Sequence, residues 1–336
     1  MEKKYFIHRI IACTSIIVLA GNIIAQDFHL SQYDATPQYL NPALTGLYMG
    51  TDAGFRANAN YRSQWRQLPI NPYTTLSLSY DQPLKRFGVG GFIINNRSGI
   101  GHFNAFNIMA SGSYRIIDDP TYKHNLSVGL QMGLLYKSFD PSQYLYDEQY
   151  SVSYGGLNPD LPNGENIEKN NMFRFDANMG VFYKYQDKDH WYHPFMGISL
   201  YHVTRPNDSF TSYIRRLPIH YLGNLGADII INEKVWIRPD FLYMYQAKAQ
   251  EITFGLLGYY HIEDTEYDAM LGVHYRHKDA VVIHTGVKYQ DNLFRVSYDI
   301  NTSYLNRFSH GRGAIEFSLI YMGKWKEKYR TKESFL

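Results

Sequence analysis

Long stretches in which apolar and polar residues alternate constrain this chain more than any other feature. In residues 173–185, one side of an extended chain carries only apolar or aromatic residues: Phe173, Phe175, Ala177, Met179, Val181, Tyr183 and Tyr185. The other side carries Arg174, Asp176, Asn178 and Lys184. Because successive side chains of a strand point to opposite faces, this pattern predicts a strand with one apolar face. Its length suffices to cross a membrane, which takes about 9 to 11 strand residues.

The same alternation returns along the whole chain, for example in residues 126–136 and 293–300. It predicts about 14 strands, an even number, as closed outer-membrane barrels of bacteria require. The predicted strands span residues 52–62, 72–82, 87–96, 101–115, 123–137, 173–186, 191–203, 218–231, 234–246, 249–261, 267–276, 280–290, 292–301 and 312–323. The 31 Tyr and 19 Phe suit the aromatic girdles of such barrels.

The connections between these strands are sorted by length. Long ones, at residues 63–71, 138–172, 204–217 and 302–311, follow odd-numbered strands, whereas those at 83–86, 232–233 and 291 are short. Outer-membrane barrels have long loops on one side and tight turns on the other. A large soluble barrel or two stacked sheets would also alternate, but neither has a reason to sort its loops. The sequence therefore predicts an all-β chain, a transmembrane antiparallel β-barrel of about 14 strands over residues 52–323.

Residues 1–25 have the pattern of a secretion signal. Lys3, Lys4 and Arg9 precede an apolar run, and cleavage is expected after Ala25. A lipoprotein signal ending at Cys13 is the alternative, but the apolar run continues well past that residue. Cys13 is the only cysteine, so the remaining chain has no disulfide and no thiolate metal site. The net charge of +2 lies in this segment, and the balanced remainder argues against nucleic acid as a partner.

Residues 26–51 fit neither the signal nor the strand pattern. Pro37 and Pro42 interrupt any regular element, so we expect an irregular N-terminal segment. A charged tail, residues 324–336, follows the last strand. If the N-terminus is periplasmic, the long loops face outside the cell and both ends of the mature chain lie in the periplasm.

Five stretches resemble, in the right order, the PorP/SprF family of outer-membrane proteins, which is associated with type IX secretion and gliding in Bacteroidetes. They are SQYDATPQYLNPALTG at 31–46, YRSQW at 61–65, LPIHY at 217–221, RVSYDINTSYL at 295–305 and GRGAIEFSLIY at 311–321. The resemblance implies a non-enzymatic barrel in outer-membrane lipid. It implies as partners a secreted cargo protein, such as an adhesin, together with periplasmic and outer-membrane subunits of the secretion system.

The N-terminal segment is a candidate plug or docking surface, since a barrel of this size has a lumen that a segment can fill. Its amide and aromatic groups suit recognition of a main chain. The residues expected to contact a partner are Gln32, Tyr33, Asn41, Pro42, Trp65 and His220. For Trp65, a place in the aromatic girdle is the favoured alternative.

Catalytic, cofactor and metal sites are not predicted. His190 and His193 are three residues apart, a spacing that places them on opposite faces of a strand. The glycines at 88, 90 and 91 precede no helix, so they form no phosphate-binding loop. The alternative function is a porin or transporter for small solutes. Inward charges such as Arg295 and Asp299 would then tune ion passage, whereas in a plugged lumen they would pair.

Overall fold

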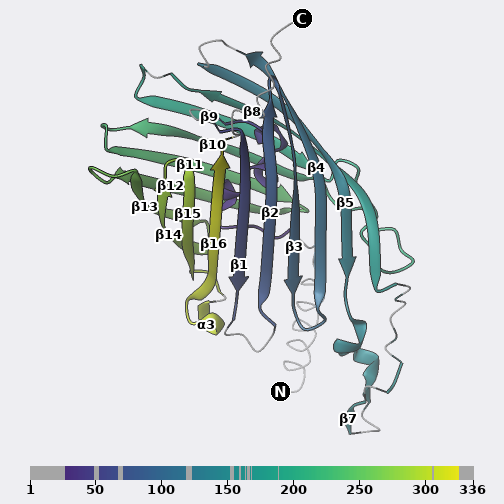
Figure 1. The fold of residues 1–336 in the computed structure, drawn as a ribbon. Coiled ribbons are helices and arrows are strands. Elements are labelled where there is room, and N and C mark those ends of the chain that lie inside the picture. The colour runs from purple at the N-terminus through teal and green to yellow at the C-terminus, as the bar shows by residue number, and fades with distance from the viewer. Residues whose placement is uncertain are drawn as a thin grey trace, which may run out of the picture.

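Fourteen strands in the described part of the chain form one closed antiparallel barrel, shown in Figure 1. The computed structural model describes residues 27–48, 53–66, 71–118, 123–151, 155–158, 160–162, 164, 167, 169–187, 189–304 and 306–324. The barrel strands are β1 Phe55–Gln64, β2 Tyr73–Leu84, β3 Phe87–Ser98, β4 Phe103–Asp118, β5 His124–Ser138, β8 Asn171–Tyr185, β9 Tyr192–Tyr201, β10 His220–Ile230, β11 Val235–Gln246, β12 Ala249–His261, β13 Tyr267–Arg276, β14 Ala280–Tyr289, β15 Asn292–Asn301 and β16 Arg312–Gly323. Neighbours in sequence pair with one another, and β1 pairs with β16 to close the barrel.

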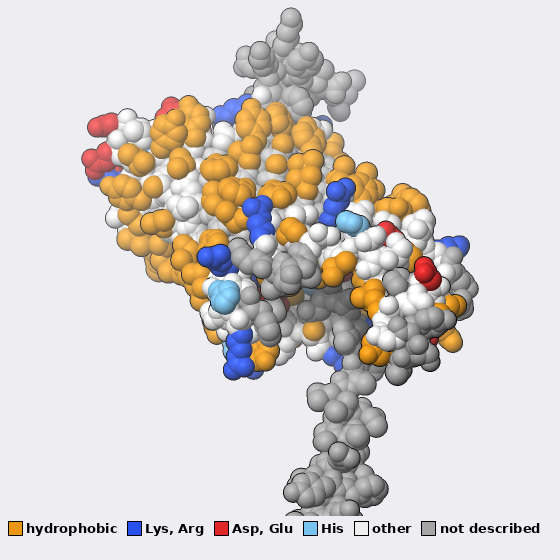
Figure 2. All heavy atoms as spheres, turned by 90° about the horizontal axis from the view of Figure 1, so that it is seen from below, with side chains coloured by type: hydrophobic (Ala, Val, Ile, Leu, Met, Phe, Trp, Pro, Cys, Tyr) orange, Lys and Arg blue, Asp and Glu red, His pale blue; other side chains and the backbone are white. Residues whose placement is uncertain are grey.

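The predicted all-β barrel is confirmed, and its strand boundaries differ from the predicted ones by a few residues. The alternation in residues 173–185 separates the two faces as expected. Phe173 is 64% exposed on the outer surface, whereas Asp176 and Asn178 are buried inside. Apolar side chains cover much of the outer wall in Figure 2, as a lipid-facing barrel requires. In the part of the chain described, no helix combines the length and apolar character needed to cross a membrane.

All the long connections lie at one end of the barrel, which we call the long-loop end; the opposite end is the short-turn end. The connection from β5 to β8 contains η3 Pro141–Gln143, η4 Asp147–Gln149 and the small hairpin of β6 Tyr150–Ser151 and β7 Gly156–Leu157. The one from β15 to β16 contains α3 Asn306–Ser309. Three connections at this end, residues 99–102, 247–248 and 277–279, are short. Parity therefore places the long loops correctly, although some loops at that end are tight turns.

Residues 27–48 lie inside the barrel, and we call them the plug. They contain η1 Tyr33–Ala35, α2 Pro37–Leu40 and η2 Pro42–Leu44. Asp27 lies beside Gln246 at the long-loop end, and Gly46 donates to the carboxylate of Asp81 near the short-turn end. The plug thus passes through the lumen from the long-loop end to the short-turn end, and β1 then runs along the wall in the opposite direction.

This direction corrects one expectation about the chain ends. Gly323, the last residue of β16, lies at the short-turn end, whereas Asp27 lies at the long-loop end. The two ends of the described chain therefore lie at opposite ends of the barrel, whereas the sequence predicts both ends of the mature chain on one side of the membrane. The sequence could not show this, because an irregular segment without periodicity carries no sign of direction.

Apolar contacts join the plug to the wall on two sides. Leu30 and Tyr39 pack with Phe92, Ile94 and Leu135 of β3 and β5. Tyr33 and Leu40 pack with residues of β9, β10 and β11 in a second cluster: Tyr201, Leu222 and Leu242. These residues interrupt the otherwise polar inner face, so the wall carries apolar patches where the plug carries its own.

Two wall glycines let the plug approach the backbone of the strands. A Cβ at Gly129 of β5 would lie 2.2 Å from the carbonyl carbon of Pro42, and one at Gly88 of β3 would lie 2.0 Å from the oxygen of Thr45. Both separations are far below van der Waals contact, so any side chain there would displace the plug or the strand. The inner wall is thus shaped for this segment.

We expect Gly129→Val to displace the plug around Pro42, because the added methyl groups would occupy the space of its backbone. The measurement is maleimide labelling of Ala43→Cys in a Cys13→Ala background, since Ala43 is fully buried. Labelling should be slow in the parent and much faster with Gly129→Val. The control is Gly223→Val, because a Cβ at Gly223 has open space around it. Equally slow labelling in both variants would contradict the assigned packing.

Candidate functional site

The lumen near the long-loop end holds a buried ionic cluster that binds the start of η1. Arg62 of β1 donates to Glu316 of β16 and Asp299 of β15, each at 2.9 Å. The carboxylate of Glu316 also accepts the backbone N–H groups of Ser31 and Gln32, at 2.8 and 3.0 Å. These charges are almost wholly removed from solvent. Such a group is tolerated only when every charge is paired, so the plug backbone completes the pairing of Glu316.

A second ionic contact ties η1 to β15. Arg295 donates through both terminal nitrogens to Asp34, at 2.9 and 2.7 Å. Its Nε donates to the side-chain oxygen of Gln32 at 2.9 Å, and the amide nitrogen of Gln32 donates to Ser297. A two-pronged contact between a guanidinium and a carboxylate fixes orientation as well as distance. The inward charges therefore pair across a plugged lumen, the second of the two alternatives considered for them.

Wall side chains satisfy the irregular backbone of the plug farther along. Asn41 donates from its amide to the carbonyls of Val181 and Ile198, at 3.0 and 3.3 Å. Its oxygen accepts from the N–H of Ala43. Four wall residues donate to plug carbonyls in the same way: Ser127 to Ala43, Gln131 to Gln38, Ser199 to Leu40 and Tyr201 to Tyr39. Without these donors, a segment with so little regular structure would leave buried carbonyls unpaired.

A clasp at the long-loop end holds the first described residue. The ring of His202 lies between two carboxylates, with Nε2 2.7 Å from Asp27 and Nδ1 2.6 Å from Asp176. Gln246 accepts the N–H of Asp27 at 2.8 Å. Burial alone would lower the pKa of His202, but the two carboxylates raise the pKa to about 10. His202 is therefore charged at neutral pH and fastens Asp27 to the loop that follows β9.

Most residues expected to contact a partner hold the plug instead of facing outward. Gln32, Tyr33 and Asn41 are buried, and the hydroxyl of Tyr33 donates to Asp240 of β11. Pro42 starts η2 against β5. Their role toward a partner stays a prediction, and in this arrangement it would be an indirect one.

The other two expected contact residues lie at the long-loop end. His220, at the start of β10, packs at a tilt against Tyr201, and its Nδ1 lies 3.4 Å from the carboxylate of Asp27. Trp65 packs edge-on against Tyr73 and borders a polar cavity of about 310 Å³ with Glu251. Trp65 therefore lies on the lumen side of the rim, not among the lipid-facing aromatic residues of a girdle.

Sequence reasoning missed some of the residues that fasten the plug. Arg62 and Glu316 occupy inward positions within the YRSQW and GRGAIEFSLIY stretches, and an inward charge on a membrane strand was the available signal. Asp27 gave no such signal because it lies in the irregular segment, and His202, which the predicted strand 191–203 included, lies one residue past the end of β9. Among the described residues, no three His, Cys, Asp or Glu side chains are grouped to hold a metal ion.

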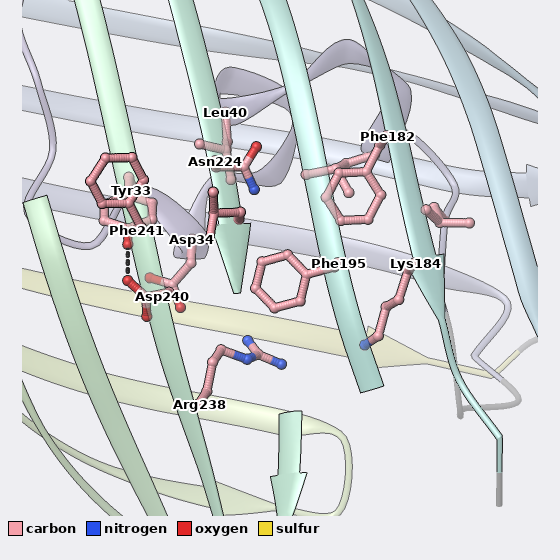
Figure 3. Close-up of a pocket in the computed structure, with 13 residues that line it drawn as sticks. Tyr33, Asp34, Leu40, Phe182, Lys184, Phe195, Asn224, Arg238, Asp240 and Phe241 are labelled. Atoms are coloured by element: carbon pink, nitrogen blue, oxygen red, sulfur yellow. Dashed lines mark hydrogen bonds between the residues drawn. The ribbon is translucent and has the colours of Figure 1, made fainter. Parts of the chain in front are cut away.

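A cavity of about 160 Å³ remains beside the plug in the short-turn half of the lumen. Plug leucines, Phe182 of β8 and Phe195 of β9 form its apolar lining, and Lys184 and Arg238 supply cationic groups. Figure 3 shows Lys184 and Arg238 reaching toward the same space from β8 and β11, with Phe195 between them. The lumen is therefore not filled completely by the plug.

Strands with an apolar outer face, a polar inner face and a segment of the same chain anchored in the lumen define a plugged transmembrane β-barrel. A family model described as the type IX secretion system membrane protein PorP/SprF matches residues 22–321. The chain belongs to this family, which places the barrel in the outer membrane. A search of curated proteins found no match.

Solved structures of hydrocarbon transporters share the fold. The toluene transporter TbuX of Ralstonia pickettii is 11% identical, with 85% of this chain and 92% of that chain covered and a TM-score of 0.54. The monoaromatic hydrocarbon channel CymD is 14% identical, with 90% and 95% covered and a TM-score of 0.52. At such identities the likeness concerns the barrel architecture alone.

The clasp gives a pH dependence with a defined sign. Because the folded-state pKa of His202 lies above its ordinary value, its stabilising contribution is complete below pH 6.5 and is lost as the pH rises to about 10. We expect the unfolding temperature of the parent to exceed that of His202→Gln at pH 6 and the difference to shrink toward pH 10. Gel-shift melting of the folded barrel measures both. His261→Gln, at an exposed His–Asp pair, is the control. A difference that is constant from pH 6 to pH 10 would contradict the charged clasp.

Arg62→Gln should destabilise the barrel by about 3–5 kcal/mol, since it leaves the buried carboxylate of Glu316 without a cation, while Asp299 keeps its pair with Arg276. Urea unfolding in detergent, followed by tryptophan fluorescence, measures the change. The control is Lys234→Gln, which breaks an exposed pair with Glu263 and should leave stability almost unchanged. Equal effects of the two substitutions would show that the lumen cluster does not hold the fold.

Proposed function

We propose that this protein is a non-enzymatic docking barrel of type IX secretion, which anchors cargo at the long-loop end and periplasmic machinery at the short-turn end. The observation that carries the proposal is the plug. A lumen occupied along its length by an anchored segment is poorly suited to free passage of solutes, which leaves the two mouths as the working surfaces. Membership of the secretion family supports the same role.

Exposed apolar side chains at the long-loop end support a protein partner there. Tyr213 and Ile214, in the loop between β9 and β10, are each 78% exposed, and Tyr304 precedes α3 with 70% exposed. Leu145 and Tyr150 of the β5–β8 connection are similarly uncovered. Aromatic and aliphatic groups of this kind are the usual anchors of protein interfaces. On this proposal, the family's cargo, including adhesins, docks on these loops.

A transporter or porin for small solutes is the second candidate. The cavity of about 160 Å³ beside the plug is the observation that favours it, because it offers a compartment within the lumen. Conductance of the purified barrel in planar bilayers separates the two functions. Stable open channels without any partner would favour the porin.

The main test is affinity purification of the protein from solubilised envelopes of its native cell, followed by mass spectrometry. We expect a large secreted protein or periplasmic secretion subunits to co-purify. Tyr213→Ser with Ile214→Ser should reduce the amount of secreted protein recovered, with Trp191→Ser, an exposed aromatic at the short-turn end, as the control. Recovery of the barrel alone would contradict the docking function.

Deleting residues 28–46 tests the role of the plug in docking. On the proposal, the deleted protein keeps a heat-modifiable barrel but no longer retains cargo. Loss of the barrel itself would assign the segment to folding. Since the deletion removes the partners of Glu316 and Arg295, the barrel should also melt at a lower temperature.

A further inference from the structure

The cavity beside the plug combines two kinds of lining that no part of the docking function uses. Its apolar part consists of the plug leucines at 40, 44 and 47 with Phe182 and Phe195. Its cationic part consists of Lys184 and Arg238. At about 160 Å³ it is the size of cavity that accepts a benzene-sized apolar group. An apolar body joined to an anionic group would match both parts.

The guanidinium of Arg238 is held in place with donors to spare. Its Nε donates to Asp228, while the rings of Phe195 and Trp236 flank it, with centroids 5.8 and 5.5 Å away. Its two terminal nitrogens have no hydrogen-bond partner within the described ranges of the chain. Such a pair of donors in a fixed plane matches the two oxygens of a carboxylate.

Among the described residues, no nearby carboxylate accepts from the two terminal nitrogens of Arg238, so a ligand can bind them. Lys184 lies 2.8 Å from Asp228, so a single carboxylate serves both cations. The two acidic residues of the lining already have other partners, since Asp34 accepts from Arg295 and Asp240 accepts from Tyr33. Figure 3 shows the Tyr33 contact on the side of the cavity away from Lys184.

The cavity borders the barrel wall beside an interruption in the pairing of β10 with β11. Its lining includes Leu225 of β10 and Phe241 of β11, which pair directly with each other. The alternation of the two strands places both side chains on the outer face of the barrel. Just beyond them, the β10–β11 pairing skips residues 227–228 and 238–239. Pro239 has no N–H to donate, which accounts for the missing ladder contacts. This position favours a ligand that comes from the membrane over a peptide that comes from the periplasm.

We propose that the cavity binds an amphiphilic carboxylate of the fatty-acid type. The carboxylate lies on the terminal nitrogens of Arg238 and on Lys184. The first carbons of the tail lie between the plug leucines and the rings of Phe182 and Phe195. Binding stabilises the plug from its open side, because the ligand fills the space that Leu44 and Leu47 leave uncovered.

The test uses the full-length protein in nanodiscs, with decanoate as the probe and titration calorimetry as the measurement. Decanol and decyltrimethylammonium have the same chain with a neutral or a cationic head, so they report partition into lipid. We expect saturable binding of decanoate alone. Equal binding of all three probes, or none by decanoate, would overturn the proposal. Binding of an acidic peptide without any decanoate binding would assign the cavity to a protein partner and would also overturn the proposal.

Variants then locate the site. Arg238→Gln and Lys184→Gln should each weaken decanoate binding about tenfold. Lys137→Gln is the matched control, since Lys137 also pairs with one aspartate, Asp208, but near the long-loop end. Asp228→Asn should tighten binding several-fold, because it removes the competing carboxylate, and a misfolded protein would not bind more tightly. Unchanged affinity in both Arg238→Gln and Asp228→Asn would refute the assigned site. Partner recovery from envelopes is a separate readout, so failure here leaves the docking function standing.

Discussion

The structure depends on how buried charge is compensated in the lumen. Arg62 joins two carboxylates from β15 and β16, and one of these carboxylates takes up the backbone N–H groups of Ser31 and Gln32. Each partner would be costly to bury alone. The plug is therefore part of the charge balance of the barrel, and the closure of β1 on β16 coincides with the place where the plug is bound. Seating of the plug therefore stabilises the closed wall.

Four of the five stretches that carry the resemblance, although far apart in the chain, contribute to this cluster. The first stretch is the plug itself. The YRSQW, RVSYDINTSYL and GRGAIEFSLIY stretches carry Arg62, Arg295, Asp299 and Glu316 on three adjacent strands. The LPIHY stretch carries His220 beside the clasp at Asp27. Residues that look scattered in the sequence thus meet around one segment, the plug.

The barrel could be predicted from sequence because each strand repeats the same local rule. The period-two pattern depends only on which face a residue occupies, so the strand spans and the inward position of Asp176 and Asn178 followed directly. The plug contacts depend on partners far along the chain, such as Glu316 for Ser31 at a separation of 285 residues, and no local period encodes them. For the same reason the direction of the plug and the lumen-side place of Trp65 were missed. Gln32 and Asn41 were singled out for their amide groups, and those amides do bind main chain, but it is the main chain of the barrel wall.

The way the plug is held argues for a fixed body, not a gate. A gate needs two positions of similar free energy, and hence an interface that is complete in each. Here the first described residue is clasped by a charged histidine, the middle is bound by paired charges, and the end passes within touching distance of wall glycines. Each contact uses a different pair of elements, so moving the plug would break them together. A barrel whose lumen is occupied in this way presents two stable faces to its surroundings, and that stability suits the attachment of large proteins better than the passage of small ones.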